Sequence, residues 1–254
     1  YIADGTVDKE NPNNKDMTSY LDPMVATAYE PGSTMKIFSF MCAIEKGNYD
    51  GEKTSLSGSK TYTSKNEGDS VTINDWNKKG WGNITYDQGF ALSSNTGIAN
   101  MLETMIDKDD LYDYFKKLGF GKKTGISLPF EENGKIKFVY PIEIANAGFG
   151  QGITTTPIQN LKAMTILANE GILLEPYLVE KIVDQETKEV TYEHQRKELG
   201  QKASKENIDK MLDVIIVTAP VSVLGARLYY VLFDGEKLTS IGEFFGFSDK
   251  GFSG

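Results

Sequence analysis

The chain has 254 residues, of which 39% are hydrophobic, and carries a formal net charge of −9. This length and apolar content allow a substantial core in one or two domains, and the acidic balance disfavours a nucleic-acid partner, which would need a basic surface. The single histidine, His194, excludes ordinary Ser-His-Asp triads and His-rich metal sites, so we predict no cofactor and no metal. Any catalysis must come from Ser, Lys, Asn, Asp and Glu.

The opening segment is polar and rich in turn residues, and residue 1 is Tyr rather than Met. We therefore expect the chain to begin inside a longer protein. The first strong element is a helix from Ser33 to about Lys46, which Gly47 ends. Its residues are apolar nearly all round, so the helix should be central and buried, with Cys42 as part of the core.

A lysine inside this helix is unusual, because burying an ammonium group costs free energy. A plain explanation of Lys36 is a side chain that extends to solvent from the helix start. The alternative is that Lys36 takes the proton of Ser33, which lies on the same face at a Cβ separation of roughly 5–6 Å. An apolar surround and the positive end of the helix dipole would lower the lysine pKa from about 10.4. Free N–H groups at the helix start could also stabilise an oxyanion.

Residues 51–75 are polar with some alternation and predict loops and edge strands. The same pairing of Ser with Lys three residues later recurs here at Ser57 and Lys60, and a Ser-x-Asn pattern recurs at Ser64 and Asn66. Neither copy has an apolar helix to bury a lysine or to hold the geometry. Context therefore favours Ser33 and Lys36 as the functional pair.

A second group of polar residues precedes a helix in the stretch FALSSNTGIANML. Its structural interpretation is an N-cap at Asn95 for a helix with apolar residues at i, i+3, i+4, i+7 and i+8. Its functional interpretation makes the Ser93 hydroxyl a proton relay toward a leaving amine and the Asn95 amide a substrate contact.

The remaining elements predict a mixed fold. Helices should follow Asp109-Asp110, Thr156-Pro157 and Ser204, and two strands should flank a polar turn within residues 177–193. Helices around a few strands favour an α/β (α+β) class.

These segments together resemble the transpeptidase domain of class B penicillin-binding proteins, especially the cell-division type of Gram-positive bacteria. The similar stretches occur in family order between about residues 20 and 212: YEPGSTMK, INDWN, QGFALSSNTGIA, LGFGKKTGISLP, GFGQGITTTPIQ and ILANEGILLEPYLV. The resemblance implies an antiparallel sheet flanked by helices, with a helical subdomain and the active site between them.

By this resemblance, Ser33 would attack the D-Ala-D-Ala carbonyl of a peptidoglycan stem peptide and form an acyl-enzyme, with Lys36 as base. Ser93 would relay protons and Asn95 would contact the substrate's peptide amide. β-Lactam antibiotics would acylate the same serine. The parent protein would be membrane-anchored, with this domain on the extracytoplasmic face and with cell-division membrane proteins as partners.

This chain departs from the family pattern at the family's third element, a Lys-Thr/Ser-Gly triplet on a sheet-edge strand. Lys123-Thr124-Gly125 has the right letters but follows Asn95 too closely, at a connecting turn, so we leave it out of the site. Residues 214–254 hold no such triplet, and GARLYYVLF resembles an early membrane segment of prolipoprotein diacylglyceryl transferases. We therefore expect a partial transpeptidase domain at 1–213, joined near Asp213 to a foreign apolar tail at 214–254. The alternative is a divergent domain whose last strands are rebuilt from that tail.

Other functions also remain open. A D,D-carboxypeptidase or a serine β-lactamase would use water as the acceptor, and a non-catalytic β-lactam sensor would stay acylated. A membrane protein fragment is supported by the tail alone.

Overall fold

The computed structural model describes residues 21–63, 70–216, 247–248 and 251–252. In chain order, the N-terminal half contains α1 (Pro23–Ala26), the 3₁₀ turn η3 (Gly32–Thr34), α2 (Met35–Glu45), β1 (Thr54–Leu56), β2 (Ser59–Thr63), β3 (Ser70–Asn74), β4 (Asn83–Thr85), α3 (Tyr86–Ala91), α4 (Asn95–Met105) and α5 (Lys108–Lys117). The rest contains α6 (Pro141–Gly148), α7 (Pro157–Ala168), β5 (Ile172–Leu174), β6 (Lys181–Val183), β7 (Val190–Glu193), β8 (Glu198–Gln201), a helix over 205–216, β9 (Phe247–Ser248) and β10 (Gly251–Phe252).

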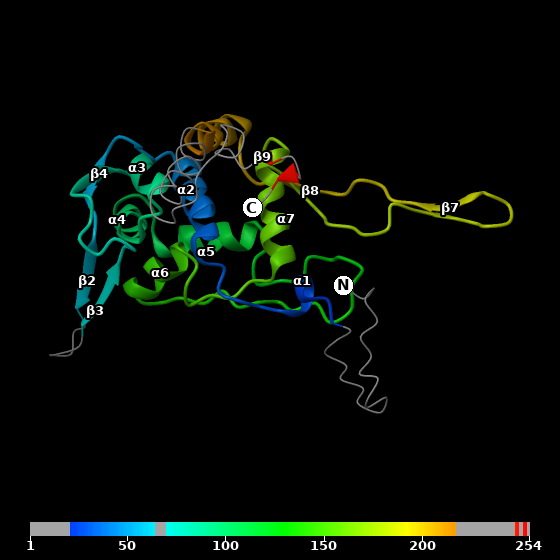
Figure 1. Ribbon diagram of the computed structural model, residues 1–254, viewed down its shortest axis with the longest axis horizontal. Helices are drawn as coiled ribbons and strands as arrows, with labels where there is room; N and C mark the ends of the chain where they lie inside the picture. Colours follow the sequence, from blue (N-terminus) through cyan, green and yellow to red (C-terminus); the bar gives the residue numbers. More distant parts are fainter. Residues whose placement is uncertain (1–20, 64–69, 217–246, 249–250, 253–254) are drawn as a thin grey trace, which may run out of the picture.

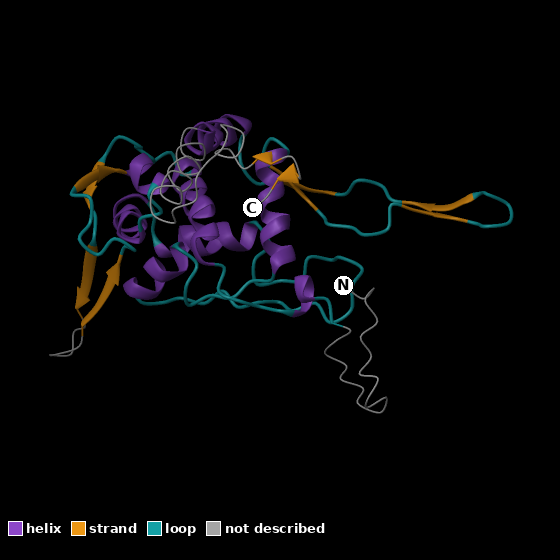
Figure 2. Ribbon diagram, viewed as in Figure 1, coloured by secondary structure: helices purple, strands orange, loops and turns teal. Residues whose placement is uncertain are grey.

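Strands and helices combine as expected for a mixed fold (Figures 1 and 2). The described strands pair two by two, all antiparallel: β1 with β4, β2 with β3, β5 with β8, β6 with β7, and β9 with β10. The predicted class, antiparallel strands with surrounding helices, is confirmed.

Helix α2 lies among α4, α5 and α6, as its all-round apolar sequence predicted (Figure 1). Its aromatic residues pack edge-on against other segments, Phe38 on Phe120 at 5.2 Å and Phe40 on Phe90 at 4.8 Å between ring centroids. Cys42 is buried within the same core, and burial raises the pKa of its thiol to about 12. This cysteine therefore contributes to packing and is unreactive.

A buried hydroxyl ties α2 to α6, because Ser39 Oγ donates to the carbonyl of Gly148 at 2.8 Å. Helix α6 can approach α4 closely only because residue 148 is glycine. A Cβ there would lie 2.4 Å from the Leu102 side chain. Helices α2, α4 and α6 thus pack directly against one another.

Two helix starts differ from the sequence prediction. The α-helix begins at Met35, and Ser33 lies in the preceding 3₁₀ turn, since Gly32 takes a left-handed φ of 59° that an α-helix cannot accommodate. The N-cap of α4 is Ser94 rather than Asn95, because the Ser94 hydroxyl accepts from the Gly97 N–H at 2.8 Å. Asn95 is the first residue of the helix.

Other predicted elements are confirmed. Helix α7 starts with a capping box between Thr156 and Gln159 and has Pro157 at its first position. Asp107 caps α5, with Asp109 and Asp110 in its first turn. The last described helix is capped by Ser204, whose hydroxyl accepts from the Asn207 N–H at 3.2 Å.

The predicted pair of strands within 177–193 forms the β6–β7 hairpin, which projects away from the helices (Figure 1). The apolar segment predicted within 214–254 lies mostly outside the described residues. Within the part of the chain that is described, no helix has both the length and the hydrophobicity needed to cross a bilayer.

Candidate active site

Ser33 lies on the exposed side of the η3 turn, just before the buried helix α2. The turn is fixed by the loop after α6, because the Gly32 N–H donates to the Gly150 carbonyl at 2.9 Å. A second bond joins the same loop to the chain before the turn, from the Gly152 N–H to Glu30 Oε1 at 2.8 Å. The hydroxyl of Ser33 is therefore presented on a rigid support.

Gly150 must be glycine for this contact to exist. Its φ is 81°, and a Cβ at this position would lie 2.1 Å from the Gly32 carbonyl oxygen. The sequence stretch GFGQG thus acts through its backbone, as a support for the Ser33 turn.

Lys36 is 2% exposed, at the start of α2. Burial lowers the pKa of its ammonium from 10.5 to about 8, against a smaller opposite effect of the Asp75 carboxylate. At pH 8 about half of the molecules would then hold a neutral amine, which can act as a base. The predicted lowering of the lysine pKa by its apolar surround is present in the structure.

Lys36 reaches Ser33 through a third residue. Its Nζ donates to the Ser93 carbonyl oxygen at 2.6 Å and to Ser93 Oγ at 2.9 Å, and Ser93 Oγ donates to Ser33 Oγ at 3.1 Å. The sequence pointed to direct proton transfer between Lys36 and Ser33. In the described structure the hydrogen bonds instead run in a chain from Lys36 through Ser93 to Ser33.

Ser93 occupies the tight turn between α3 and α4 in a left-handed conformation, with φ of 53°. A non-glycine residue in this region is strained, and such strain persists only where neighbouring contacts hold it. The turn points both polar atoms of Ser93, the carbonyl and the hydroxyl, at Lys36.

Asn95 follows two residues later and is half-buried. Its Nδ2 donates to the Asn74 carbonyl at the end of β3, at 3.1 Å. The structure thus brings Ser33, Lys36 and Ser93 into one hydrogen-bonded group, while the side chain of Asn95, two residues after Ser93, binds the end of β3 instead.

Sequence reasoning missed Asp75, which lies in the INDWN stretch directly after β3. Its carboxylate is 2% exposed and accepts from the backbone N–H of Thr96 at 2.9 Å, at the start of α4. The available signal was a charged residue directly after a predicted edge strand, within a stretch that resembles the family.

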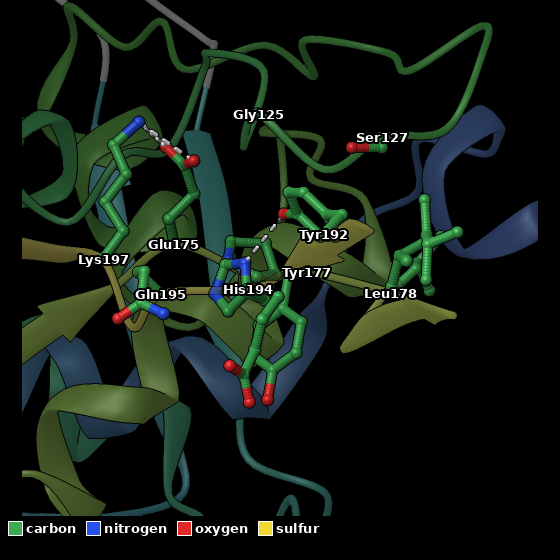
Figure 3. Close-up of a pocket in the computed structure, with 13 residues that line it drawn as sticks. Gly125, Ser127, Glu175, Tyr177, Leu178, Tyr192, His194, Gln195 and Lys197 are labelled. Atoms are coloured by element: carbon green, nitrogen blue, oxygen red, sulfur yellow. Dashed lines mark hydrogen bonds and ion pairs between the residues drawn. The ribbon is translucent and has the colours of Figure 1, made fainter. Parts of the chain in front are cut away.

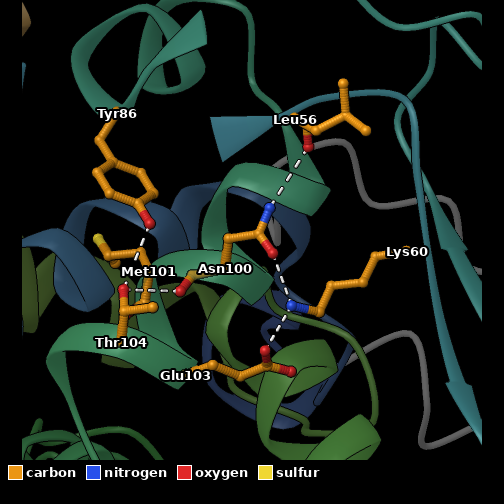
Figure 4. A network of polar contacts seen from close by, with 7 residues as sticks. All are labelled: Leu56, Lys60, Tyr86, Asn100, Met101, Glu103 and Thr104. Carbon is orange, nitrogen blue, oxygen red and sulfur yellow. Dashed lines mark hydrogen bonds and ion pairs between the residues drawn. The ribbon is translucent and has the colours of Figure 1, made fainter. Parts of the chain in front are cut away.

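In the second Ser-x-x-Lys pattern, Ser57 and Lys60 bind different parts of the structure. Ser57 Oγ donates to the Gly82 carbonyl at 2.8 Å, and Lys60 Nζ contacts Asn100 Oδ1 at 2.6 Å and Glu103 Oε2 at 2.5 Å (Figure 4). The hydroxyl of Ser57 and the ammonium of Lys60 thus have different hydrogen-bond partners. The Ser64 to Asn66 copy lies outside the described residues.

The Lys123-Thr124-Gly125 segment is part of an internal network. The buried Glu131 carboxylate accepts from both the N–H and the hydroxyl of Thr124 at 2.6 Å, and Lys162 Nζ donates to the Thr124 carbonyl at 3.0 Å. Gly125 donates from its N–H to the same carboxylate at 3.4 Å and also lines a separate pocket at the base of the β6–β7 hairpin, where His194 stacks on Tyr177 at 3.7 Å (Figure 3). None of the four predicted site residues lines that pocket.

No cluster of three or more His, Cys, Asp or Glu side chains suitable for a metal ion occurs among the residues that the structure describes. The hydrogen-bonded group consists of the buried amine of Lys36, the half-buried hydroxyl of Ser93 and the exposed hydroxyl of Ser33.

A family model described as the penicillin-binding protein transpeptidase domain matches residues 5–222. The chain belongs to this family. Stage V sporulation protein D of Bacillus subtilis is 36% identical over 168 residues, which cover 65% of this chain and 25% of that protein. The chain thus spans about a quarter of the length of this curated relative.

Solved structures of penicillin-binding proteins share the fold. Penicillin-binding protein 2X from Streptococcus thermophilus superposes with a TM-score of 0.70 at 27% identity, over 88% of this chain and 32% of that one. Penicillin-binding protein 3 from Mycobacterium tuberculosis, complexed with aztreonam, gives 0.64 at 26% identity, over 76% and 42%. The family predicted from the sequence motifs is confirmed.

Proposed function

We propose that this transpeptidase domain catalyses peptidoglycan D,D-transpeptidation through an acyl-enzyme at Ser33. The observation that supports this most strongly is the hydrogen-bonded chain from Lys36 through Ser93 to Ser33. The exposed hydroxyl is open to a substrate carbonyl. The buried amine has a pKa of about 8, so at neutral pH a useful fraction of it is uncharged and can act as a base.

In the first half-reaction, Ser33 Oγ bonds to the carbonyl carbon of the penultimate D-Ala of a stem peptide. Its proton passes through the Ser93 hydroxyl to neutral Lys36, and the backbone N–H of Ser33 itself stabilises the oxyanion, since the Gly32 N–H is bound to the Gly150 carbonyl. The C–N bond to the terminal D-Ala then breaks. The leaving amine takes back a proton from Ser93, which Lys36 replenishes.

In the second half-reaction, the amine of another stem peptide attacks the ester carbonyl and gives up a proton to Lys36. Lys36 returns that proton through Ser93 to the Ser33 oxygen, which leaves as a hydroxyl, and the new amide cross-links the two stems. We assign Asn95 to the substrate, with its Oδ1 accepting from a peptide N–H while Nδ2 is fixed by Asn74. A β-lactam carbonyl would be attacked in the same way, with cleavage of the lactam C–N bond and a persistent ester.

The test is the mass of the chain after exposure to penicillin, with the modified residue mapped. We expect a single adduct on Ser33, lost in Ser33→Ala and slowed at least 100-fold in Lys36→Ala, as expected for loss of a general base. Lys60→Ala is the matched control, because Lys60 occupies the same Ser-x-x-Lys spacing and pairs with Glu103. An adduct on any other residue would contradict the proposal.

The acceptor distinguishes transpeptidation from related activities. A stem-peptide amine should resolve the acyl-enzyme faster than water does. Rapid hydrolysis of a chromogenic cephalosporin would instead indicate a β-lactamase, and an ester that no amine resolves would indicate a β-lactam sensor.

We further propose that the parent protein places this domain on the extracytoplasmic face of the membrane and works with cell-division membrane proteins. The division of the chain near Asp213 stays a proposal, because residues 217–246 lie outside the described structure. Replacing 214–254 by a family segment that carries the Lys-Thr/Ser-Gly strand should raise the rate of penicillin labelling. Equal labelling of both proteins would contradict this division.

A further inference from the structure

We propose that Asp75 is a positioning residue that holds the Ser93 turn against Lys36 and thereby aligns the proton relay. This inference rests on the proposed acylation chemistry for its consequence, and on the hydrogen bonds of Asp75 for its geometry. The residue lies outside the relay itself and touches neither Ser33 nor Lys36 through a hydrogen bond in the described structure.

The Asp75 carboxylate is buried and is surrounded by hydrogen-bond donors. Oδ2 accepts from the Gly58 N–H at 2.8 Å and from Thr96 Oγ1 at 2.8 Å, while Oδ1 accepts from the Thr96 N–H at 2.9 Å. Ser94 Oγ lies within 3.1 Å of both oxygens. Within the described part of the chain, no lysine or arginine forms an ion pair with it, so all of its direct partners are backbone and hydroxyl donors, which compensate its burial.

These donors come from two separate parts of the structure. Gly58 belongs to the turn between β1 and β2, and it also accepts from the Asp75 N–H at 2.9 Å. Ser94 and Thr96 belong to the first turn of α4, where a negative charge also interacts favourably with the helix dipole. Asp75 therefore joins the strand region rigidly to the start of α4.

The hydrogen bonds from Ser94 and Thr96 to Asp75 form a clamp on the start of α4, and Ser93 directly precedes it. Its strained left-handed backbone is held on one side by Ser94, which Asp75 fixes, and on the other by Lys36, which binds its carbonyl and hydroxyl. Without the clamp, the backbone of Ser93 can relax to an unstrained conformation. Its hydroxyl would then leave the line between Lys36 and Ser33.

Asp75 also acts on Lys36 through space. Among the described charged groups, its carboxylate is the one whose field affects the lysine, and it raises the lysine pKa against the effect of burial. The other groups that face Lys36 are the hydroxyl and carbonyl of Ser93, which carry no charge. Removing the Asp75 charge should therefore lower the Lys36 pKa below about 8.

The Asp75→Asn variant separates positioning from a general loss of stability. The Asn amide can accept from Thr96, but its NH₂ group then meets the Gly58 N–H, which is also a donor. We expect Lys36 to titrate at lower pH, followed by NMR of labelled lysine side chains in the 254-residue chain. We also expect penicillin acylation to fall about 10- to 100-fold at high pH, where Lys36 is neutral in both proteins.

The pH dependence of the rate ratio is the diagnostic readout. At low pH the variant holds more neutral Lys36, which partly offsets its misplaced relay, so the ratio of parent to variant rates should grow as pH rises. A variant that is only partly unfolded would lose the same factor at every pH, and that result would overturn the proposal. An unchanged acylation rate would also overturn it.

Two further variants and a control complete the test. Asp75→Glu keeps the charge but shifts the carboxylate, so it should lower the acylation rate with little change in the Lys36 titration. Thr96→Val removes one donor and leaves Asp75 in place, so it should slow acylation even if Asp75→Asn does not fold. Asp107→Asn, at the cap of α5, should change neither quantity.

These readouts keep this inference distinct from the proposed function. If penicillin does not acylate the parent chain at Ser33, the proposed function fails, whereas the NMR titration of Lys36 still tests Asp75. If the parent chain is acylated and Asp75→Asn matches it in rate, the role of Asp75 fails alone.

Discussion

The ammonium of Lys36 donates to two atoms of one residue, the carbonyl oxygen of Ser93 at 2.6 Å and its hydroxyl at 2.9 Å. This double contact couples the backbone conformation of the α3–α4 turn to the position of the Lys36 amine. Because Ser93 in turn donates to Ser33, the alignment of the Ser33 hydroxyl with the Lys36 amine depends on a turn that is distant from both in the sequence.

The first prediction concerns pH. If Lys36 must be neutral to accept the proton, acylation should rise with pH and reach half of its maximum near pH 8, the pKa that burial gives this amine. Below that pH the protonated amine cannot act as a base, and above it the rate should level off. Stopped-flow measurement of penicillin acylation between pH 6 and 10 checks this. A rate that is flat over this range would contradict the role of Lys36.

The second prediction uses the strained backbone of Ser93. Ser93→Ala and Ser93→Gly both remove the relay hydroxyl, so both should acylate at least 100-fold more slowly than the parent chain. Glycine adopts the φ of 53° without strain, so Ser93→Gly should be more stable than Ser93→Ala by about 1 kcal/mol. Thermal unfolding measures the difference. Equal stability of the two variants would show that the turn is not strained.

The third prediction concerns the glycine loop that supports Ser33. Gly150→Ala should lose both stability and acylation, because the new Cβ would collide with the Gly32 carbonyl and displace the turn. Gly152→Ala is the matched control, since Gly152 has a similar φ of 71° but no atom within 4 Å of its Cβ position. The control should cost only about 1 kcal/mol, the price of a left-handed alanine, and should keep its acylation rate. Equal effects on the rate would contradict the support by Gly150.

The fourth prediction concerns the Lys123-Thr124-Gly125 segment. Thr124→Val removes the hydroxyl that binds the buried Glu131 carboxylate, so the free energy of unfolding should fall by about 1 to 3 kcal/mol. Acylation by the folded protein should stay at the parent rate, because this network lies apart from Ser33. Denaturant unfolding and penicillin labelling measure the two quantities. A loss of penicillin labelling without a loss of stability would indicate that this segment is part of the active site.

Much of this protein could be predicted from local sequence. Helix α2 follows from its continuous apolar residues and the glycine at its end, and α7 follows from Thr156, Pro157 and Gln159 at its start. The choice of Ser33 and Lys36 over Ser57 and Lys60 also needed only the sequence, because a buried helix is needed to lower a lysine pKa. In each case the deciding residues are near neighbours in the chain.

Tertiary structure decided how these residues work together. Periodicity predicts Ser33 and Lys36 on one helix face, but it cannot show that Gly150 supports the Ser33 turn or that Ser93 lies between the Ser33 hydroxyl and the Lys36 amine. Nor can it show that Asp75 holds the start of α4. Those contacts join residues that are far apart in the chain, and they exist only after the core has packed. The sequence by itself determined which side chains are the candidates for the chemistry. The packed fold determined their alignment, because hydrogen-bond geometry between distant segments depends on where the core places each backbone.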